Sequence, residues 1–256
     1  MKQPGKWEQY LLLSTDPLTE KNLPQTIKYS LANLLDFINS FDYAYVKHER
    51  TGQGRAIFKV YKEEGDSYCF SGYSIQGKPI TKCVTRIEDF HKILHPLERF
   101  GRQENYIIQE GIKSYTPTGL PMSIRVHVQL LKGKWVIGGM NANIGSQLTT
   151  DNGILNYHRG SSIITIDELM SLHCQMDEEK KKEILDCIEE VSISAAKIIA
   201  SHYPNREYGI DLGLNAEHQP ILYEVNTTPG ISGFAGIGNK TIWKRIVEIR
   251  KLQNEE

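Results

Sequence analysis

Apolar and polar residues alternate with a period of two in several segments, and this pattern predicts β-strands. The clearest segment is 123–131, whose isoleucine, valine and leucine side chains share one face. Arg125, His127 and Gln129 must then lie on the opposite face. Residues 134–140 complete a predicted hairpin with this strand.

A second predicted hairpin joins Tyr43–Lys47 to Ala56–Tyr61 through a tip that contains Thr51-Gly52-Gln53-Gly54. Further short strands are predicted at 68–75, 79–84, 106–110, 208–214 and 220–225. Runs of strands separated by turns are typical of antiparallel sheets.

One long segment has helical periodicity instead. From Glu178 to Ala200, isoleucine, valine and alanine recur at a spacing of about 3.6 residues. Shorter helices are predicted at 6–13, 27–38 and 87–100, and a basic one from about Lys240. Helices beside antiparallel strands place the chain in the α+β class.

Composition narrows the functional classes. The chain has 256 residues with 30 Lys+Arg against 31 Asp+Glu, so its net charge of -1 provides no long-range attraction for nucleic acid or an anionic membrane. No apolar run approaches the roughly 20 residues that span a bilayer, and we expect a cytoplasmic protein. Neither a P-loop nor a Gly-x-Ser-x-Gly motif is present, which disfavours P-loop NTPases and serine hydrolases.

The cysteines and histidines give only weak evidence for a site that binds a metal such as Zn²⁺. The four cysteines, Cys69, Cys83, Cys174 and Cys187, show no Cys-x-x-Cys spacing, so we expect free thiols. His91 and His95 lie four apart on a predicted helix but lack a third ligand, which favours an exposed pair over a zinc site.

The last two predicted strands carry the most informative polar residues. If they pair as a hairpin, Asp211 and Glu224 point into one space, and Asn226 follows Glu224 on the same face. Hard oxygen ligands of this kind suit Mg²⁺, which would relieve the repulsion between the two carboxylates. The same spacing also fits a hairpin whose acids face solvent.

The glycine-containing tip offers a second candidate site. Lys47 ends one strand, and the loop beyond it can lay backbone N–H groups over anionic oxygens, as a phosphate cover requires. An ordinary turn has the same composition.

Taken in the order in which they occur along the chain, the motifs of this sequence resemble those of the ATP-grasp superfamily, and most closely those of its YheC/YheD branch. The resemblance covers nearly the whole chain and rests on Lys6-Trp7-Glu8, Tyr106–Ile112, Ile124–Val128, Asn156–Gly160 and, most specifically, Glu224-Val-Asn-Thr-Thr-Pro-Gly230. It implies two α+β lobes with ATP between them. The expected division is a helical lead-in at 1–40, a small lobe with the glycine loop at 41–110 and a large lobe at 111–256.

The resemblance also implies roles for individual residues. Lys47 would contact the α- and β-phosphates, and Gln53 and Gly54 would lie over the triphosphate. The adenine hinge would be Gln109, Glu110, Gly111 and Ile112. Asp211, Glu224 and Asn226 would hold Mg²⁺, and Arg125 and Arg159 would stabilise charge on the transferring phosphoryl group.

The implied activity is that of an ATP- and Mg²⁺-dependent, ADP-forming ligase. It would join a carboxylate of an amino acid, peptide or protein to an amine through an acylphosphate. Two alternatives stay open: a non-catalytic ATP-binding scaffold associated with spore formation, and a kinase. His48, Ala56, Ser123, Asn143 and Ser161 depart from the family pattern, which makes ATP binding a safer expectation than catalysis.

Acceptor binding has fewer sequence signals. Most relatives carry an additional N-terminal domain, so we expect the acceptor to be bound by the large lobe, by a second copy of the chain or by a partner protein. Loops 145–160 and 231–239 would form the acceptor surface.

Overall fold

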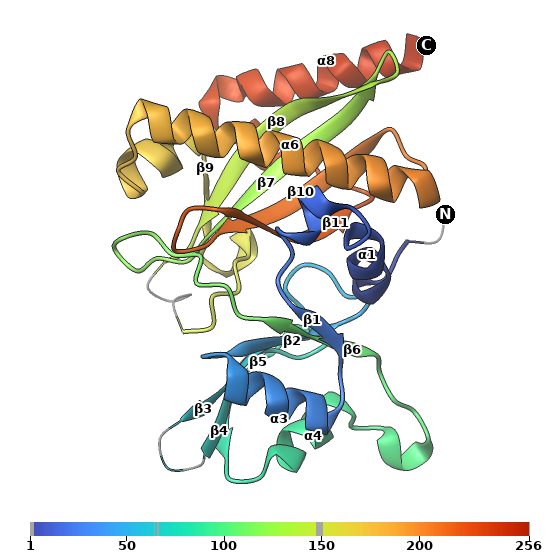
Figure 1. Ribbon diagram of the computed structural model, residues 1–256, viewed down its shortest axis with the longest axis vertical. Helices are drawn as coiled ribbons and strands as arrows, with labels where there is room; N and C mark the ends of the chain where they lie inside the picture. Colours follow the sequence, from blue (N-terminus) through green and yellow to red (C-terminus); the bar gives the residue numbers. More distant parts are fainter. Residues whose placement is uncertain (1–2, 64, 66, 147–150, 256) are drawn as a thin grey trace.

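The computed structural model describes residues 3–63, 65, 67–146 and 151–255, which form two lobes, each built on an antiparallel sheet (Figure 1). The small-lobe sheet has the strand order β1-β6-β2-β3-β4-β5. Its strands are β1 (Thr26–Lys28), β2 (Ala44–His48), β3 (Ile57–Glu63), β4 (Ser67–Tyr73), β5 (Pro79–Val84) and β6 (Tyr106–Glu110).

Two helices cover one face of this sheet: α3 (Leu31–Ser40) and α4 (Ile87–Leu94), followed by a 3₁₀ turn at Glu98–Phe100. The Ser30 hydroxyl caps α3 by accepting the Asn33 N–H. The core between helices and sheet contains Leu34, Val46, Phe58, Phe90 and Ile108. Because strand side chains alternate, Lys47 and Gln109 point from the other face, towards the large lobe.

The large-lobe sheet has the strand order β11-β10-β7-β8-β9. Its strands are β7 (Met122–Leu131), β8 (Lys134–Ile144), β9 (Ser162–Ile164), β10 (Glu207–Leu214) and β11 (Pro220–Asn226). The helices and short turns of this lobe are Tyr157–Arg159, α5 (Ile166–Glu168), Leu169–His173, α6 (Glu178–His202), α7 (Ser232–Ala235), Gly238–Lys240 and α8 (Thr241–Glu255).

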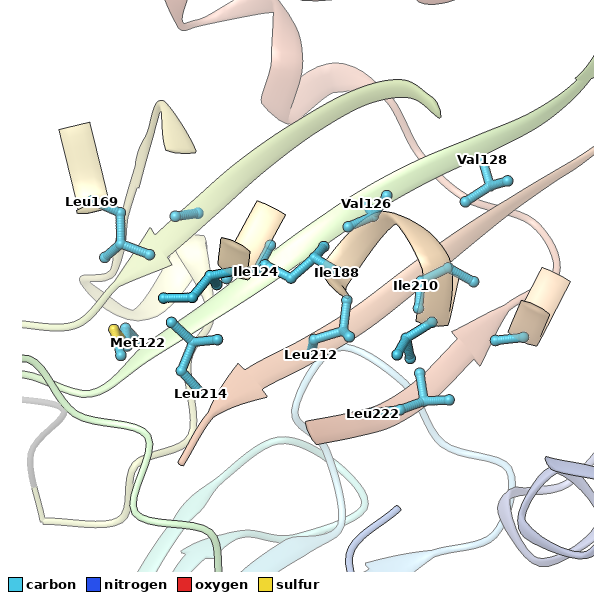
Figure 2. Close-up of a cluster of buried hydrophobic side chains, with 14 of the residues drawn as sticks. Met122, Ile124, Val126, Val128, Leu169, Ile188, Ile210, Leu212, Leu214 and Leu222 are labelled. Carbon is cyan, nitrogen blue, oxygen red and sulfur yellow. The ribbon is translucent and has the colours of Figure 1, made fainter. Parts of the chain in front are cut away.

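The predicted long helix is confirmed as α6, and its apolar stripe packs on the large-lobe sheet (Figure 2). Ile188 is fully buried among β7 and β10 side chains such as Val126 and Ile210. At about 25 cal/mol per Å² of buried apolar surface, this core stabilises the lobe strongly. It therefore provides a rigid support for the polar residues on the far side of the sheet.

The far side is also buried, although its residues are polar. α7 and α8 cover it, and the His127 and Gln129 side chains are fully inaccessible. His127 Nε2 lies 3.1 Å from a Glu207 carboxylate oxygen, and Arg250 of α8 donates two hydrogen bonds to the same carboxylate. Although burial raises the pKa of Glu207, these contacts lower it to about 2.

Residues 3–40 contribute elements to both lobes. α1 (Lys6–Leu13) and α2 (Pro17–Glu20) pack on the large lobe, whereas Thr26–Lys28 pairs with β6 as β1, although the helix predicted at 27–38 included two of its three residues. Pairing with a neighbouring strand decides this segment, because three residues provide no periodicity to read. The helix predicted for 87–100 ends at Leu94, two residues before Pro96, because proline disfavours helix in the residue before it.

The prediction of four free thiols is wrong for one pair. Cys69 and Cys83 form a disulfide, whereas Cys174 and Cys187 are free. The cysteines are 14 residues apart, but the β4–β5 hairpin places them directly opposite each other, with a Cα–Cα distance of 4.0 Å. Strand register, which the sequence spacing does not reveal, brings them together.

The histidine pair is likewise not exposed. His91 Nδ1 lies 3.1 Å from the Tyr29 hydroxyl and Nε2 lies 2.9 Å from a Glu98 oxygen, so both of its ring nitrogens have partners. His95 is buried beside it. Among the described residues, no helix is both long enough and apolar enough to cross a membrane.

Candidate active site

A cleft lies between the two sheets and encloses about 900 Å³ of empty space, part of which is open to solvent. The small lobe contributes Tyr45, Lys47 and Gln109, and the large lobe contributes Asp211 and Glu224. A second hollow continues from Glu224 under the glycine loop towards α1. Helix α1, the glycine loop and strand β11, which are far apart in the sequence, thus meet around the Glu224 carboxylate.

The predicted acid cluster forms on neighbouring strands. Asp211 of β10 is the register partner of Glu224 on β11, and Asn226 follows on the same face. The Asn226 Oδ1 accepts the Thr228 N–H at 2.9 Å, which fixes the turn beyond the strand. The sequence prediction that the two carboxylates and the carboxamide share a face agrees with this register.

A break in the register adds a side chain that the sequence did not predict. The β10–β11 pairing shifts between Asp211 and Leu212, so that Leu222 enters the core while both Tyr223 and Glu224 line the cleft. Bulges of this kind redirect side chains beside active sites. Gly213 lies next to the bulge, and a Cβ there would lie 2.0 Å from the Tyr223 hydroxyl, so a larger residue would force Tyr223 to move.

Arg125 occupies the space next to the acids. Its Nε and Nη2 donate to the two oxygens of Asp211 at 2.5 and 2.8 Å. Gly209 makes this position possible, since a Cβ at residue 209 would approach Arg125 Nη1 to 2.7 Å. Burial raises the pKa of Asp211, and the neighbouring guanidinium opposes that rise.

Lys47 faces the acids from the other lobe. Its ammonium group donates to the Gln109 Oε1 and lies 5.5 Å from the ring centroids of both Tyr45 and Tyr223. Burial lowers its pKa to about 8, although the negative charge of Glu224 partly offsets this effect. A desolvated cation without a carboxylate in direct contact is well suited to receive an anionic ligand.

The residue that the sequence reading missed is Lys6. Its Nζ lies 3.2 Å from Glu224 Oε1 and donates to the Thr51 carbonyl of the glycine loop at 2.8 Å. The side chain is only 7% exposed. One weak signal was present: a lysine at the start of a helix is unfavourable to the helix dipole, and a nearby anion offsets that effect.

The glycine loop is held in place by the large lobe. Arg159 Nη1 donates to the Gly54 carbonyl at 2.9 Å, and its guanidinium carbon lies 3.7 Å from the Tyr73 ring centroid. Asn156 donates to the Gln53 carbonyl at 2.8 Å. Arg159 therefore contacts the loop, whereas Arg125 contacts the acids, and the two predicted catalytic arginines do not share one set of partners.

The predicted hinge connects the lobes as one edge of the cleft. Gln109, Glu110 and Ile112 line it. The Gly111 N–H donates to the Tyr43 carbonyl at 3.1 Å, and the Ile112 carbonyl accepts the Tyr43 hydroxyl at 2.8 Å. Part of the backbone for which the family resemblance implies base recognition thus already makes hydrogen bonds within the protein.

One of the family departures, Ser123, lines the cleft and is the register partner of a second, Asn143 on β8. A third, Ser161, is buried. Of the expected acceptor loop 145–160, residues 147–150 lie outside the described part of the chain.

The donor set fits Mg²⁺. Asp211, Glu224 and Asn226 offer hard oxygen atoms, and Mg²⁺ is held in proteins by one or two carboxylates together with water and phosphate. The cations of Lys6 and Lys47 lie beside these acids, where phosphate oxygens would complete the shell.

Two α+β lobes, each built on an antiparallel sheet, enclose a cleft with Lys47 on one side and the paired acids on the other, and this arrangement defines the ATP-grasp class of nucleotide-binding proteins. Within that class, the chain belongs to the YheC/D-like ATP-grasp family, whose model matches residues 2–250. No curated protein matches the chain significantly in sequence.

Solved structures agree on the fold. The D-Ala:D-Ser ligase VanG of Enterococcus faecalis superposes with a TM-score of 0.53 at 14% identity, over 95% of this chain and 60% of that one. The D-cycloserine synthetase DcsG gives a TM-score of 0.55 at 12% identity, over 95% and 68%. The ATP-grasp ligase PsnB, complexed with a minimal precursor, gives 0.53 at 14%, over 98% and 60%. The chain thus spans about three fifths of the length of VanG and PsnB.

Proposed function

We propose that this protein is an ATP- and Mg²⁺-dependent, ADP-forming ligase that joins a carboxylate to an amine. The observation that carries the proposal is the meeting of Asp211, Glu224 and Asn226 with Lys6 and Lys47 beneath a glycine loop. Membership of the ATP-grasp family supports the same reaction class. The carboxylate substrate would belong to an amino acid, a peptide or a protein.

The reaction has two steps. A carboxylate oxygen attacks the γ-phosphorus of ATP, which forms an acylphosphate and releases ADP. The amine nitrogen then attacks the carbonyl carbon, inorganic phosphate leaves, and the nitrogen loses a proton to give the amide. Mg²⁺ held by the acids would neutralise charge on the phosphates.

The chain's own residues divide the work between them. Lys47 and Lys6 bind phosphate oxygens, and the loop around Gln53 and Gly54 excludes water from them. Arg125 lies beside the acids, where its charge would stabilise the oxyanion of the tetrahedral intermediate. Arg159 fixes the loop through the Gly54 carbonyl.

Release of ADP and phosphate in the presence of Mg-ATP tests the proposal, with pooled amino acids and short peptides as substrates. We expect substrate-stimulated ADP release that Asp211→Asn and Glu224→Gln each reduce more than 100-fold, since either change removes a carboxylate ligand. Glu217→Gln, an exposed acid on the β10–β11 turn, is the matched control and should retain full activity.

Two other results would change the assignment. ATP binding without ADP release in any pool would favour the scaffold alternative, which the departures at Ser123, Asn143 and Ser161 suggest. A stable phosphorylated product without an amide would identify a kinase.

A further inference from the structure

The small lobe carries a group of ligand atoms that the nucleotide site does not use. One carboxylate oxygen of Glu63 and the sulfur atoms of Cys69 and Cys83 all lie within 4.8 Å of one another. They come from the adjacent strands β3, β4 and β5. Their shared face is opposite to the one that α3 and α4 cover.

The contact between carboxylate and sulfur is informative. Glu63 Oε2 lies 3.0 Å from Cys69 Sγ and 3.8 Å from Cys83 Sγ. A carboxylate only accepts hydrogen bonds, and a disulfide sulfur has no hydrogen to donate. The carboxylate is therefore placed for a state in which the sulfurs carry protons or share a cation with it.

The geometry points to a binding site for one thiophilic divalent cation of the Zn²⁺ class, formed by Glu63, Cys69 and Cys83 when the disulfide is reduced. Bonds of about 2.0–2.3 Å around a tetrahedral Zn²⁺ separate its ligand atoms by about 3.3–3.8 Å. The oxygen–sulfur distances of 3.0 and 3.8 Å lie near this range, and the two sulfur atoms, which are bonded to each other in the disulfide, must separate to it after reduction. Water would supply the fourth ligand, because Glu63 and Cys83 are exposed.

The site differs in chemistry from the acid cluster of the cleft. Thiolates select Zn²⁺ over Mg²⁺, whereas Asp211 and Glu224 offer only oxygen. The chain thus holds one hard site and one soft site, and binding at the soft site should be insensitive to millimolar Mg²⁺.

Formation of the site requires reduction. A phosphine and one water molecule convert the Cys69–Cys83 bond into two thiols, and the phosphine leaves as its oxide. The cation then replaces the two thiol protons, so that oxidation and metal binding exclude each other.

Zn²⁺ binding by the whole chain tests this proposal. The protein is reduced with a phosphine without oxygen, mixed with Zn²⁺ in excess Mg²⁺ and desalted, and the metal is then quantified. We expect one Zn²⁺ per reduced chain, none per oxidised chain, and a thiolate-to-metal absorption band when Co²⁺ replaces Zn²⁺. Bound Zn²⁺ should also slow alkylation of Cys83 at least tenfold.

Single substitutions identify the ligands. Cys83→Ser should abolish binding, and Glu63→Gln should weaken it at least tenfold; both side chains are exposed, so the fold should tolerate either change. Cys187→Ser, at a free and half-buried cysteine, is the control and should bind normally. Reduced wild-type protein without stoichiometric Zn²⁺, or undiminished binding by Cys83→Ser, would overturn the proposal.

Discussion

Arg125 donates to both carboxylate oxygens of Asp211, at 2.5 and 2.8 Å, and the proposed Mg²⁺ site would use the same oxygens. A metal ion that binds Asp211 must therefore share this carboxylate with the arginine or displace it. The guanidinium also offsets the repulsion between Asp211 and Glu224, which are register partners.

Arg125→Gln should destabilise the metal-free protein by about 2–3 kcal/mol, because Asp211 loses a paired cation in a desolvated position. Mg²⁺ should restore part of this loss in the variant and stabilise the wild type less. Chemical denaturation with and without Mg²⁺ measures both effects. Arg86→Gln, at an exposed arginine, is the control; equal Mg²⁺ effects in the variant and the wild type would contradict the prediction.

Lys6→Met should lower the affinity for Mg-ATP by about 10- to 100-fold, the range for a charged hydrogen-bonding group. Lys6 lies between Glu224 and the glycine loop, so its loss removes a cation from the phosphate region. Calorimetric titration with a non-hydrolysable ATP analogue measures the affinity. Lys21→Met, at an exposed lysine, should bind as the wild type does; an unchanged affinity in Lys6→Met would exclude the residue from the site.

Nucleotide affinity should depend on pH through Lys47. Because burial lowers the pKa of Lys47 to about 8, the free protein loses this positive charge above pH 8. Phosphate binding favours the charged form, so affinity should fall by up to about tenfold per pH unit above 8. In Lys47→Arg, whose side chain stays charged, binding measured from pH 7 to 9.5 should lose this dependence. A wild-type nucleotide affinity that stays constant up to pH 9.5 would contradict the lowered pKa of Lys47.

The lowered pKa of Lys47 also makes the stability of the folded protein depend on pH. The folded state lowers the pKa of Lys47, so it disfavours the charged form relative to the unfolded chain. The resulting penalty is fully present below pH 8 and declines as the pH rises towards 10.5. Removing the amine with Lys47→Met should therefore raise stability at pH 7 more than at pH 10.

Arg159→Ala distinguishes a loop-fixing arginine from a catalytic one. Its contacts with the Gly54 carbonyl and the Tyr73 ring predict an increase in the KM for ATP of about tenfold, with kcat changed less than threefold. A residue that stabilises the transition state would instead lower kcat by about 10²–10³. Steady-state kinetics separates the two, with Arg102→Ala, at an exposed arginine, as the control.

Much of the architecture followed from local patterns. The alternation in residues 123–131 and the helical period of 178–200 predicted β7 and α6 because each element buries one apolar face. The pairing of Asp211 with Glu224 followed from a short hairpin, in which a tight turn restricts the possible registers.

Contacts between distant segments could not be read in this way. Lys6 reaches Glu224, 218 residues away, and Thr26–Lys28 becomes a strand because β6 offers an unpaired edge. The bulge that turns Tyr223 into the cleft and the register that places Cys69 against Cys83 are equally invisible in residue spacing.

The sequence by itself thus determined the longer elements, the fold class and the residue types of the acid cluster, since propensity and periodicity act over a few residues. The tertiary structure alone decided which cations face those acids, that the polar face of β7 is buried beneath α7 and α8, and that two cysteines and a glutamate meet on the small lobe. Those outcomes depend on packing between lobes, helices and strands, where burial and charge compensation act across the whole chain.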